Sequence, residues 1–152
     1  MKKVFALILT VCLLAAMATT AFAANTTGGD ADITTSIAPT YTVTIPADVN
    51  VTFNATETAF GAIEVTASQI HPDKCIKVEL TSDGKLENSI DNTKVIPYAI
   101  KDADGAAFTS ATYLTEGDKT ELSIQITADD WNAAYAGDYS DTVTFTVSYE
   151  DK

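Results

Sequence analysis

The stretch AGDYSDTVTFTVSYE, Ala136 to Glu150, decides the fold class of this 152-residue chain. Its second half alternates apolar and hydroxyl side chains with a period of two residues, the pattern of a half-buried β-strand. The apolar positions are Val143, Phe145, Val147 and Tyr149, and the hydroxyl positions are Thr142, Thr144, Thr146 and Ser148. We therefore expect a strand that presents one face to a core and the other to solvent.

Similar short runs recur between turn-forming residues along the rest of the chain. They are residues 40–46, 49–53, 61–67, 75–80, 95–100, 108–114 and 121–127. The chain after residue 23 also contains 21 threonines, which suit the solvated face of a pleated sheet. This rhythm predicts an all-β fold: a single antiparallel immunoglobulin-like β-sandwich of about eight or nine strands. The sandwich domain is expected to span residues 39–152.

The first 23 residues have the three parts of a secretory signal peptide. Lys2 and Lys3 form the basic start, Val4 to Met17 the apolar run, and Ala21 to Ala23 an A-x-A cleavage site. The apolar run is too short for a stable transmembrane helix. We expect a signal helix that is removed after Ala23, so that the protein is secreted, extracellular or associated with the cell surface, and not inserted in the membrane after cleavage.

The charge balance restricts the partners of the mature chain. Removal of residues 1–23 leaves seven lysines, no arginine and 21 acidic residues, a net charge of −14. Because nucleic acids and anionic membranes require a basic surface, we expect neither as a partner. Strong acidity is typical of a protein that stays soluble outside the cell.

The segment from residue 24 to residue 38 differs from the rest of the mature chain. It is polar and contains two glycines, and then offers Ile33 and Ile37 among threonines before Pro39. One interpretation is a flexible N-terminal tail. The other is an edge strand that adds to its own sheet or to that of a neighbour by main-chain hydrogen bonds. In the second case the chain polymerises, and Ile33 and Ile37 are the assembly candidates.

One stretch, TADDWNAAYAGDY (residues 127–139), is predicted to be helical. Asp129 or Asp130 is expected to cap one or two turns, and Gly137 to end them. Trp131 and Tyr135 are four residues apart and are expected to share a face. Either they close the open end of the sandwich, or they form an aromatic platform for a sugar ring, with Asp130 as a hydrogen-bond acceptor.

The mature chain keeps a single cysteine, Cys75, so no intramolecular disulfide is possible. In CIKVEL, residues 75–80, the apolar Ile76, Val78 and Leu80 alternate with the other positions. Cys75 is therefore expected on the polar face near a strand end. It is either an idle thiol or the site of an intermolecular disulfide.

No catalytic or cofactor-binding pattern stands out, and we expect a protein that is not an enzyme and needs no cofactor. His71 is the only histidine, too few for a usual zinc ligand set even together with Cys75. Asp102 and Asp104 in DADG copy the start of a calcium loop and are the weak metal candidates. Ala106 and Tyr113 stand where that loop requires further oxygen ligands, so the sequence favours a hairpin turn.

Two stretches resemble known secreted domains. YAGDYSDTVTFTVSY, residues 135–149, resembles the final motif of spore coat protein U and pilin-like domains. Together with APTYTVTIPADVNV, residues 38–51, it is also similar to small secreted β-sandwich proteins and WxL-type surface proteins of Gram-positive bacteria. The resemblance implies an immunoglobulin-like sandwich that works in surface assembly or adhesion. AGDY is also similar to a tyrosine corner, which implies that the Tyr139 hydroxyl bonds to nearby backbone.

Two functional hypotheses follow. The first is a secreted, non-catalytic structural or adhesive surface protein that self-assembles by β-strand addition, with other surface proteins or its own copies as partners. The second is a carbohydrate-binding module that binds glycans through Trp131 and Tyr135.

Overall fold

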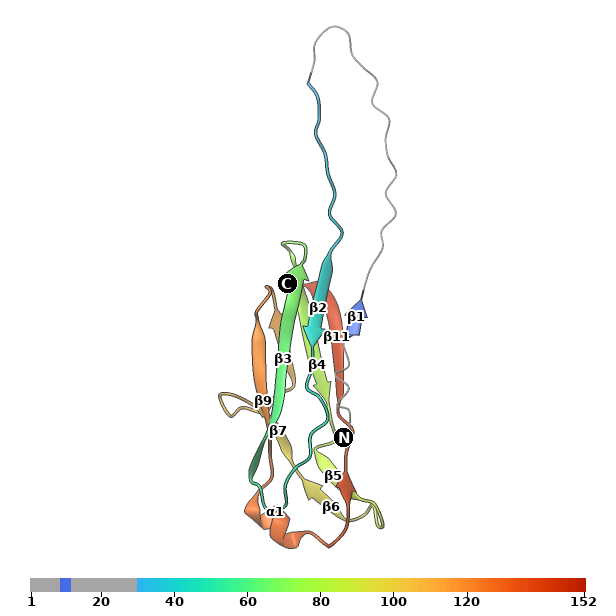
Figure 1. Cartoon of the computed structure of the whole chain (residues 1–152), viewed down its shortest axis with the longest axis vertical. Helices are drawn as coiled ribbons and strands as arrows, with labels where there is room; N and C mark the ends of the chain where they lie inside the picture. The colour runs from blue at the N-terminus through green and yellow to red at the C-terminus, as the bar shows by residue number, and fades with distance from the viewer. Residues whose placement is uncertain (1–8, 12–29) are drawn as a thin grey trace, which may run out of the picture.

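The computed structural model describes residues 9–11 and 30–152, which form mainly antiparallel strands (Figure 1). The expected all-β class is confirmed, since the described part contains one helix, α1 (Ala128–Ala133), of six residues. The predicted signal peptide lies outside the described residues except for strand β1 (Leu9–Val11). The other strands are β2 (Thr40–Thr44), β3 (Glu57–Gln69), β4 (Lys74–Thr81), β5 (Lys85–Asn88), β6 (Val95–Pro97), β7 (Ala99–Asp102), β8 (Ser110–Tyr113), β9 (Lys119–Gln125), β10 (Tyr139–Ser140) and β11 (Thr144–Asp151).

The strands form three antiparallel sheets. Their orders are β1-β2-β3-β9-β7, β11-β4-β8 and β10-β5-β6. The long strands of the first two sheets run along the long axis of the molecule, and α1 lies at one end of that axis (Figure 1). The ring centroids of Phe60 in β3 and Phe145 in β11 lie 6.0 Å apart, so the first two sheets are in contact.

The alternation predicted for the last strand is confirmed in β11. Phe145, Val147 and Tyr149 are half-buried, whereas Thr144 and Thr146 are exposed. β11 pairs with β4 over eight residues, from the Thr144↔Thr81 pair to the Asp151↔Lys74 pair. Residues that pair directly across the two strands point to the same face of the sheet, and side chains one residue apart point to opposite faces. The inward side chains of β11 and β4 therefore lie on one face.

One core is shared by the sheets. Ile63 and Val65 of β3 and Ile76 and Val78 of β4 are completely buried. The core also contains Val43, Ile96, Ile100, Phe108, Tyr113, Leu122, Ile124, Ile126 and Trp131. Most of these are β-branched or aromatic residues that pack well on pleated surfaces.

The strand expected at residues 49–53 is wrong. The chain is irregular from the end of β2 to the start of β3, and Asn54 adopts a left-handed backbone conformation with a φ of 66°. Phe53 is 71% exposed. No neighbouring strand pairs with this stretch in the described part of the chain, so its alternating pattern has no ladder to join.

The helix is predicted correctly, but its expected ends are wrong. Thr127 caps it, and its hydroxyl accepts a hydrogen bond from the Asp130 N–H, a common N-cap arrangement. The helix ends at Ala133, and Ala134 is already extended. Tyr135 therefore lies beyond the helix, so the four-residue spacing does not place it on the same helical face as Trp131.

The hydrogen bond implied for Tyr139 is confirmed. Its hydroxyl donates to the carbonyl oxygen of Tyr135 at 3.0 Å and accepts from the Tyr135 N–H at 3.1 Å. A single side chain thus satisfies both backbone groups of a residue four positions earlier. The bond fixes the turn that leads from α1 into β10.

Replacing Tyr139 with Phe should lower the free energy of unfolding by about 1–2 kcal/mol, because both backbone groups of Tyr135 lose their partner. Urea denaturation measures the loss. Tyr135→Phe is the matched control: its ring is 64% exposed, and the expected change is below about 0.5 kcal/mol. Equal losses in the two variants would contradict the corner's role.

Candidate functional site

The strongest candidate site is a groove along one side of the molecule. It lies between the irregular stretch of residues 45–51 and the stretch of residues 139–145, and it has a volume of about 1090 Å³. We call it the lateral groove. Its two walls are about 90 residues apart in the sequence, so only the fold brings them together.

The first wall is the continuation of β2. Pairing between β2 and β3 stops at Thr44↔Glu64, and the chain then passes over Gly61. Gly61 has a φ of 119°, and a Cβ added there would lie 3.5 Å from the Cβ of Pro46. Since Pro46 has no N–H to donate to a ladder, the chain leaves the sheet here and becomes a wall of the groove.

The second wall is held by a buried amide. The Asn88 side chain is 5% exposed, and its Oδ1 accepts hydrogen bonds from the N–H groups of Ile90 and Asp91. Its Nδ2 approaches the Ala136 carbonyl oxygen at 3.5 Å. A Cβ at Gly137 would lie 2.4 Å from this Nδ2, so only glycine lets the two segments come so close. The contact anchors the turn that precedes β10.

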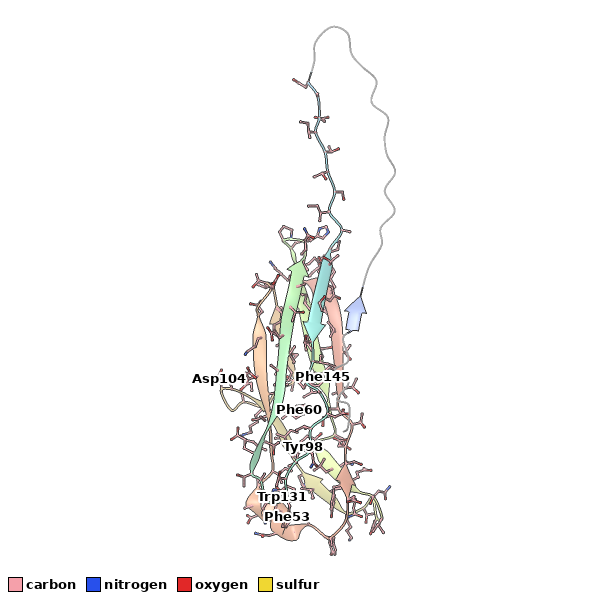
Figure 2. All side chains as sticks on the ribbon, viewed as in Figure 1. Phe53, Phe60, Tyr98, Asp104, Trp131 and Phe145 are labelled. Atoms are coloured by element: carbon pink, nitrogen blue, oxygen red, sulfur yellow. The ribbon has the colours of Figure 1, made fainter. Side chains whose placement is uncertain are left out.

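The lining of the lateral groove is largely apolar. Buried side chains such as Ile96 and Ile100 form its floor. Half-buried side chains stand on its walls: Ile45, Val51, Phe60, Leu86, Val143 and Phe145. Figure 2 shows Phe145, Phe60, Tyr98, Trp131 and Phe53 following one another from the middle of the body to the end where α1 lies. The groove therefore extends toward the α1 end of the molecule.

Two aromatic pairs bridge the sheet that contains β2 and β3 and the sheet that contains β11. Tyr41 of β2 stacks on Tyr149 of β11 with ring centroids 5.8 Å apart. Phe60 and Phe145 form the next pair toward α1. These contacts show that β2 and β11 border the same side of the molecule.

Both of these strands have an outer edge on that side. β11 is the outermost strand of its sheet. β2 pairs on its outer side with β1, in the register Leu9↔Val43 to Val11↔Tyr41, and β1 belongs to the predicted signal peptide. Within residues 30–152, no strand pairs with either outer edge. Unpaired edges of this kind are templates for another strand.

The assembly candidates Ile33 and Ile37 lie outside the body of the protein. Residues 30–39 run outward from the start of β2, away from the α1 end (Figure 1). Ile33 is 99% exposed and Ile37 is 63% exposed. The segment thus presents two large apolar side chains to solvent at one end of the long axis.

The structure places the candidate ligand-binding aromatics in different environments. Trp131 is buried, its Nε1–H donates to the Ala55 carbonyl oxygen at 2.9 Å, and its ring meets the Phe53 ring edge-on. Tyr135 is exposed, and Lys94 Nζ lies 5.0 Å from its ring centroid. Asp130 accepts from the Thr127 hydroxyl as part of the helix cap. The three residues therefore have structural partners, and the two rings do not form one open platform.

The weak metal candidates Asp102 and Asp104 lie in a tight turn. Asp102 Oδ1 accepts hydrogen bonds from the N–H groups of Asp104 and Ala106, and the Gly105 N–H donates to the Asp102 carbonyl oxygen. The turn expected at DADG is confirmed. No group of three or more His, Cys, Asp or Glu side chains that could hold a metal ion is found in the described ranges.

Cys75 lies near the start of β4, on the face opposite Ile76 as expected, but it is buried there. Its side chain is 4% exposed, and its sulfur lies 3.7 Å from the Glu150 carbonyl oxygen and 3.6 Å from that of Asp151. The alternation of β4 does put Cys75 on the face opposite Ile76. The C-terminal end covers that face locally, because the Lys152 N–H bonds back to the Asp73 carbonyl oxygen.

Tyr98, which lines the lateral groove, has a strongly raised pKa. Burial, together with a hydrogen bond to the Asp141 carboxylate, raises the pKa of Tyr98 to about 12. Ser82 Oγ lies 2.8 Å from the Tyr98 hydroxyl. The Tyr98 hydroxyl thus connects Asp141, in the second wall of the groove, to the segment that contains Tyr98.

The sequence indicated the exposed isoleucines but not the lateral groove. The available signal was the unpaired apolar pattern of residues 45–53, which continues past Pro46 without a partner strand.

No protein-family model and no curated protein matches this chain. The one helix of the described residues is too short and too polar to cross a membrane.

Asp141→Asn should lower the pKa of Tyr98 from about 12 while leaving it above 10.0, because burial is the main cause of the shift and persists in the variant. The unfolded chain ionises first, near 10.0, so the stability that Tyr98 contributes is complete below that pH and is lost as the pH rises to about 12. The titration of Tyr98 is measured by phenolate absorbance, as the difference between the curve of the protein and that of the Tyr98→Phe variant. Asp138→Asn is the control, and an equal shift there would refute the assignment.

Cys75 should react with a thiol reagent such as Ellman's reagent only after unfolding, because the native sulfur is buried. In the chain that begins at Ala24, which lacks Cys12, the expected readout is no fast reaction in buffer and one reactive thiol in urea. Thr146→Cys, on the exposed face of β11, should add one thiol that reacts at once. Rapid labelling of the unsubstituted native protein would show that Cys75 is accessible.

Proposed function

We propose that this chain is a secreted, non-catalytic structural or adhesive surface protein with an immunoglobulin-like β-sandwich, and that its copies assemble by β-strand addition. The order β2-β3-β9-β7 is consistent with the four-stranded sheet of that fold, and the β4–β11 pair with two strands of the other sheet. Tyr139 supports this assignment. Its hydroxyl bonds to the backbone of Tyr135, as in a tyrosine corner, just before the last long strand, β11.

The observation that carries the proposal is the exposure of Ile33 and Ile37 on an extended segment. Two fully buried isoleucines contribute about 3–6 kcal/mol relative to exposed ones. A second copy offers a place to bury them. The same step would give the backbone of the segment hydrogen-bond partners on a sheet edge.

The predicted signal peptide and the net charge of −14 support a location outside the cell, where the mature domain remains soluble. The glycan-binding alternative stays a prediction. It gains no support from the buried Trp131, whose ring packs against Phe53.

The chain beginning at Ala24 should form oligomers whose size grows with concentration, because each copy carries an exposed apolar segment. Ile33→Asn combined with Ile37→Asn should leave it monomeric, as the burial of both side chains is lost. Size-exclusion chromatography with light scattering, followed by electron microscopy, measures the outcome.

The matched control is Thr34→Asn combined with Ser36→Asn. These positions lie between the isoleucines and point to the other side of an extended segment, so assembly should persist. A chain that stays monomeric under all conditions would refute the proposal. Loss of assembly in both double variants would show that assembly does not depend specifically on the side of the segment that carries Ile33 and Ile37.

A further inference from the structure

We propose that the lateral groove binds a cationic amphiphile, that is, a small molecule that carries one ammonium group at the end of a hydrocarbon chain. Such a site goes beyond the proposed function and does not depend on the assembly of copies. Three features of the groove support it: its volume, its apolar interior and the sign of the charges on its walls.

The interior of the groove suits a hydrocarbon chain. Its volume of about 1090 Å³ is close to the upper limit of small-molecule pockets, roughly 1000 Å³. Buried Ile96 and Ile100 form the floor, and half-buried side chains such as Phe60 and Phe145 stand on the walls. Each methylene group that leaves water on these side chains strengthens binding roughly fourfold. The interior therefore favours an apolar ligand over a polar one of the same size.

The charges on the walls favour a cation. In the part of the chain that the structure describes, three aspartates and no lysine line the groove: Asp48, Asp138 and Asp141. All three side chains are exposed. The expected mature chain is itself acidic, with a net charge of −14. An apolar molecule with an anionic head group is therefore repelled from the groove, whereas one with an ammonium group is attracted.

Asp48 and Asp141 define where the ammonium group lies. The first wall runs from β2 toward α1, and the second wall runs from β10 into β11, away from α1 (Figure 1). Asp48 is in the middle part of the first wall, and Asp141 is in the middle part of the second. Because the walls run in opposite directions, the two residues stand at about the same level on opposite sides. An ammonium group between them is attracted to both.

The Asp141 carboxylate is already oriented for this role. Its Oδ1 accepts a hydrogen bond from the Thr142 N–H at 2.6 Å, and its Oδ2 accepts one from the Tyr98 hydroxyl. An ionised carboxylate offers about four acceptor positions, so about two stay free for the N–H groups of an ammonium. Since the side chain is fixed before the ligand arrives, binding loses little conformational entropy.

The α1 end of the groove contains an ammonium of the chain itself. Lys94 Nζ lies 5.0 Å from the centroid of the Tyr135 ring, and Tyr135 lines the groove. This contact is a cation–π interaction with one of the aromatic rings of the lining. Because like charges repel, a second cation is directed away from this end and toward Asp48 and Asp141.

Titration calorimetry tests the site in the chain that begins at Ala24 and carries Ile33→Asn and Ile37→Asn, which keeps assembly out of the measurement. The probes are decylammonium, decanoate and butylammonium, each below its micelle-forming concentration. Decylammonium should bind at one site per chain and about tenfold more tightly than either other probe. Decanoate has the opposite charge, and butylammonium lacks most of the chain. Equal affinities for decylammonium and decanoate would overturn the proposal.

The wall charges are tested in the same background with Asp48→Asn combined with Asp138→Asn. Loss of two nearby charges should weaken decylammonium binding roughly threefold or more. The matched control is Asp104→Asn combined with Glu116→Gln, which changes the net charge equally. Neither control residue lines the groove, and Figure 2 shows Asp104 on a loop away from Phe60 and Phe145. An equal loss in both double variants would mean that net charge, and not the groove, attracts the probe.

A cation placed inside the groove tests the location directly. Val143→Lys adds a positive charge to the lining and should reduce decylammonium binding about tenfold or more. Thr144→Lys adds the same charge on the exposed face of β11 and should leave most of the affinity. Equal binding by the two variants would place the probe elsewhere and overturn the proposal.

Methyl NMR identifies the occupant of the groove. Decylammonium should shift the methyl signals of Ile96, Ile100 and Val143 in the double asparagine chain. If it shifts none of them, and the same signals shift when unsubstituted copies assemble, the occupant is another copy and the ligand proposal fails. A failure of the unsubstituted chain to assemble refutes only the proposed function, because all the binding measurements use a chain designed to be monomeric.

Discussion

The main physical constraint on this molecule is the position of two strand edges, those of β2 and β11, that have no partner strand within residues 30–152 and lie on the same side of the molecule as an apolar groove. A sheet edge carries free N–H and C=O groups that favour the addition of another strand. β2 and β11 bring such edges to the same side, where the aromatic pairs Tyr41–Tyr149 and Phe60–Phe145 hold the two sheets together. The backbone therefore offers hydrogen bonds next to side chains that favour burial.

The groove stays open because its walls are fixed by contacts that do not depend on an occupant. Pro46 packs over Gly61 on one side, and Asn88 holds the segment that contains Gly137 on the other. Tyr139 fixes the turn between them and α1. A wall anchored in this way loses little conformational entropy when a ligand binds, which favours association.

Local sequence patterns predicted the strands well where a partner strand exists. The alternation from Thr144 to Tyr149 corresponds to a real two-faced strand because β4 pairs with all of it. The same alternation failed at residues 49–53, where the chain has no ladder to join. The burial of Cys75 was missed for a related reason: it depends on the backbone of Glu150 and Asp151, residues that are distant in the sequence. Periodicity describes a residue's own strand and not what covers it.

The lateral groove shows this limit most clearly, since its walls come from opposite ends of the mature chain. Ile33 and Ile37, by contrast, could be noticed from the sequence, because large apolar residues in a polar segment require an explanation. The acidic surface restricts which contacts between copies can be stable. Copies of the expected mature chain, each with a charge of −14, would repel one another, so an association of the kind proposed requires burial and backbone pairing that outweigh this repulsion. The apolar lining of the lateral groove and the outer edge of β11, which has no partner strand in the described residues, bring both favourable terms to one side of the molecule.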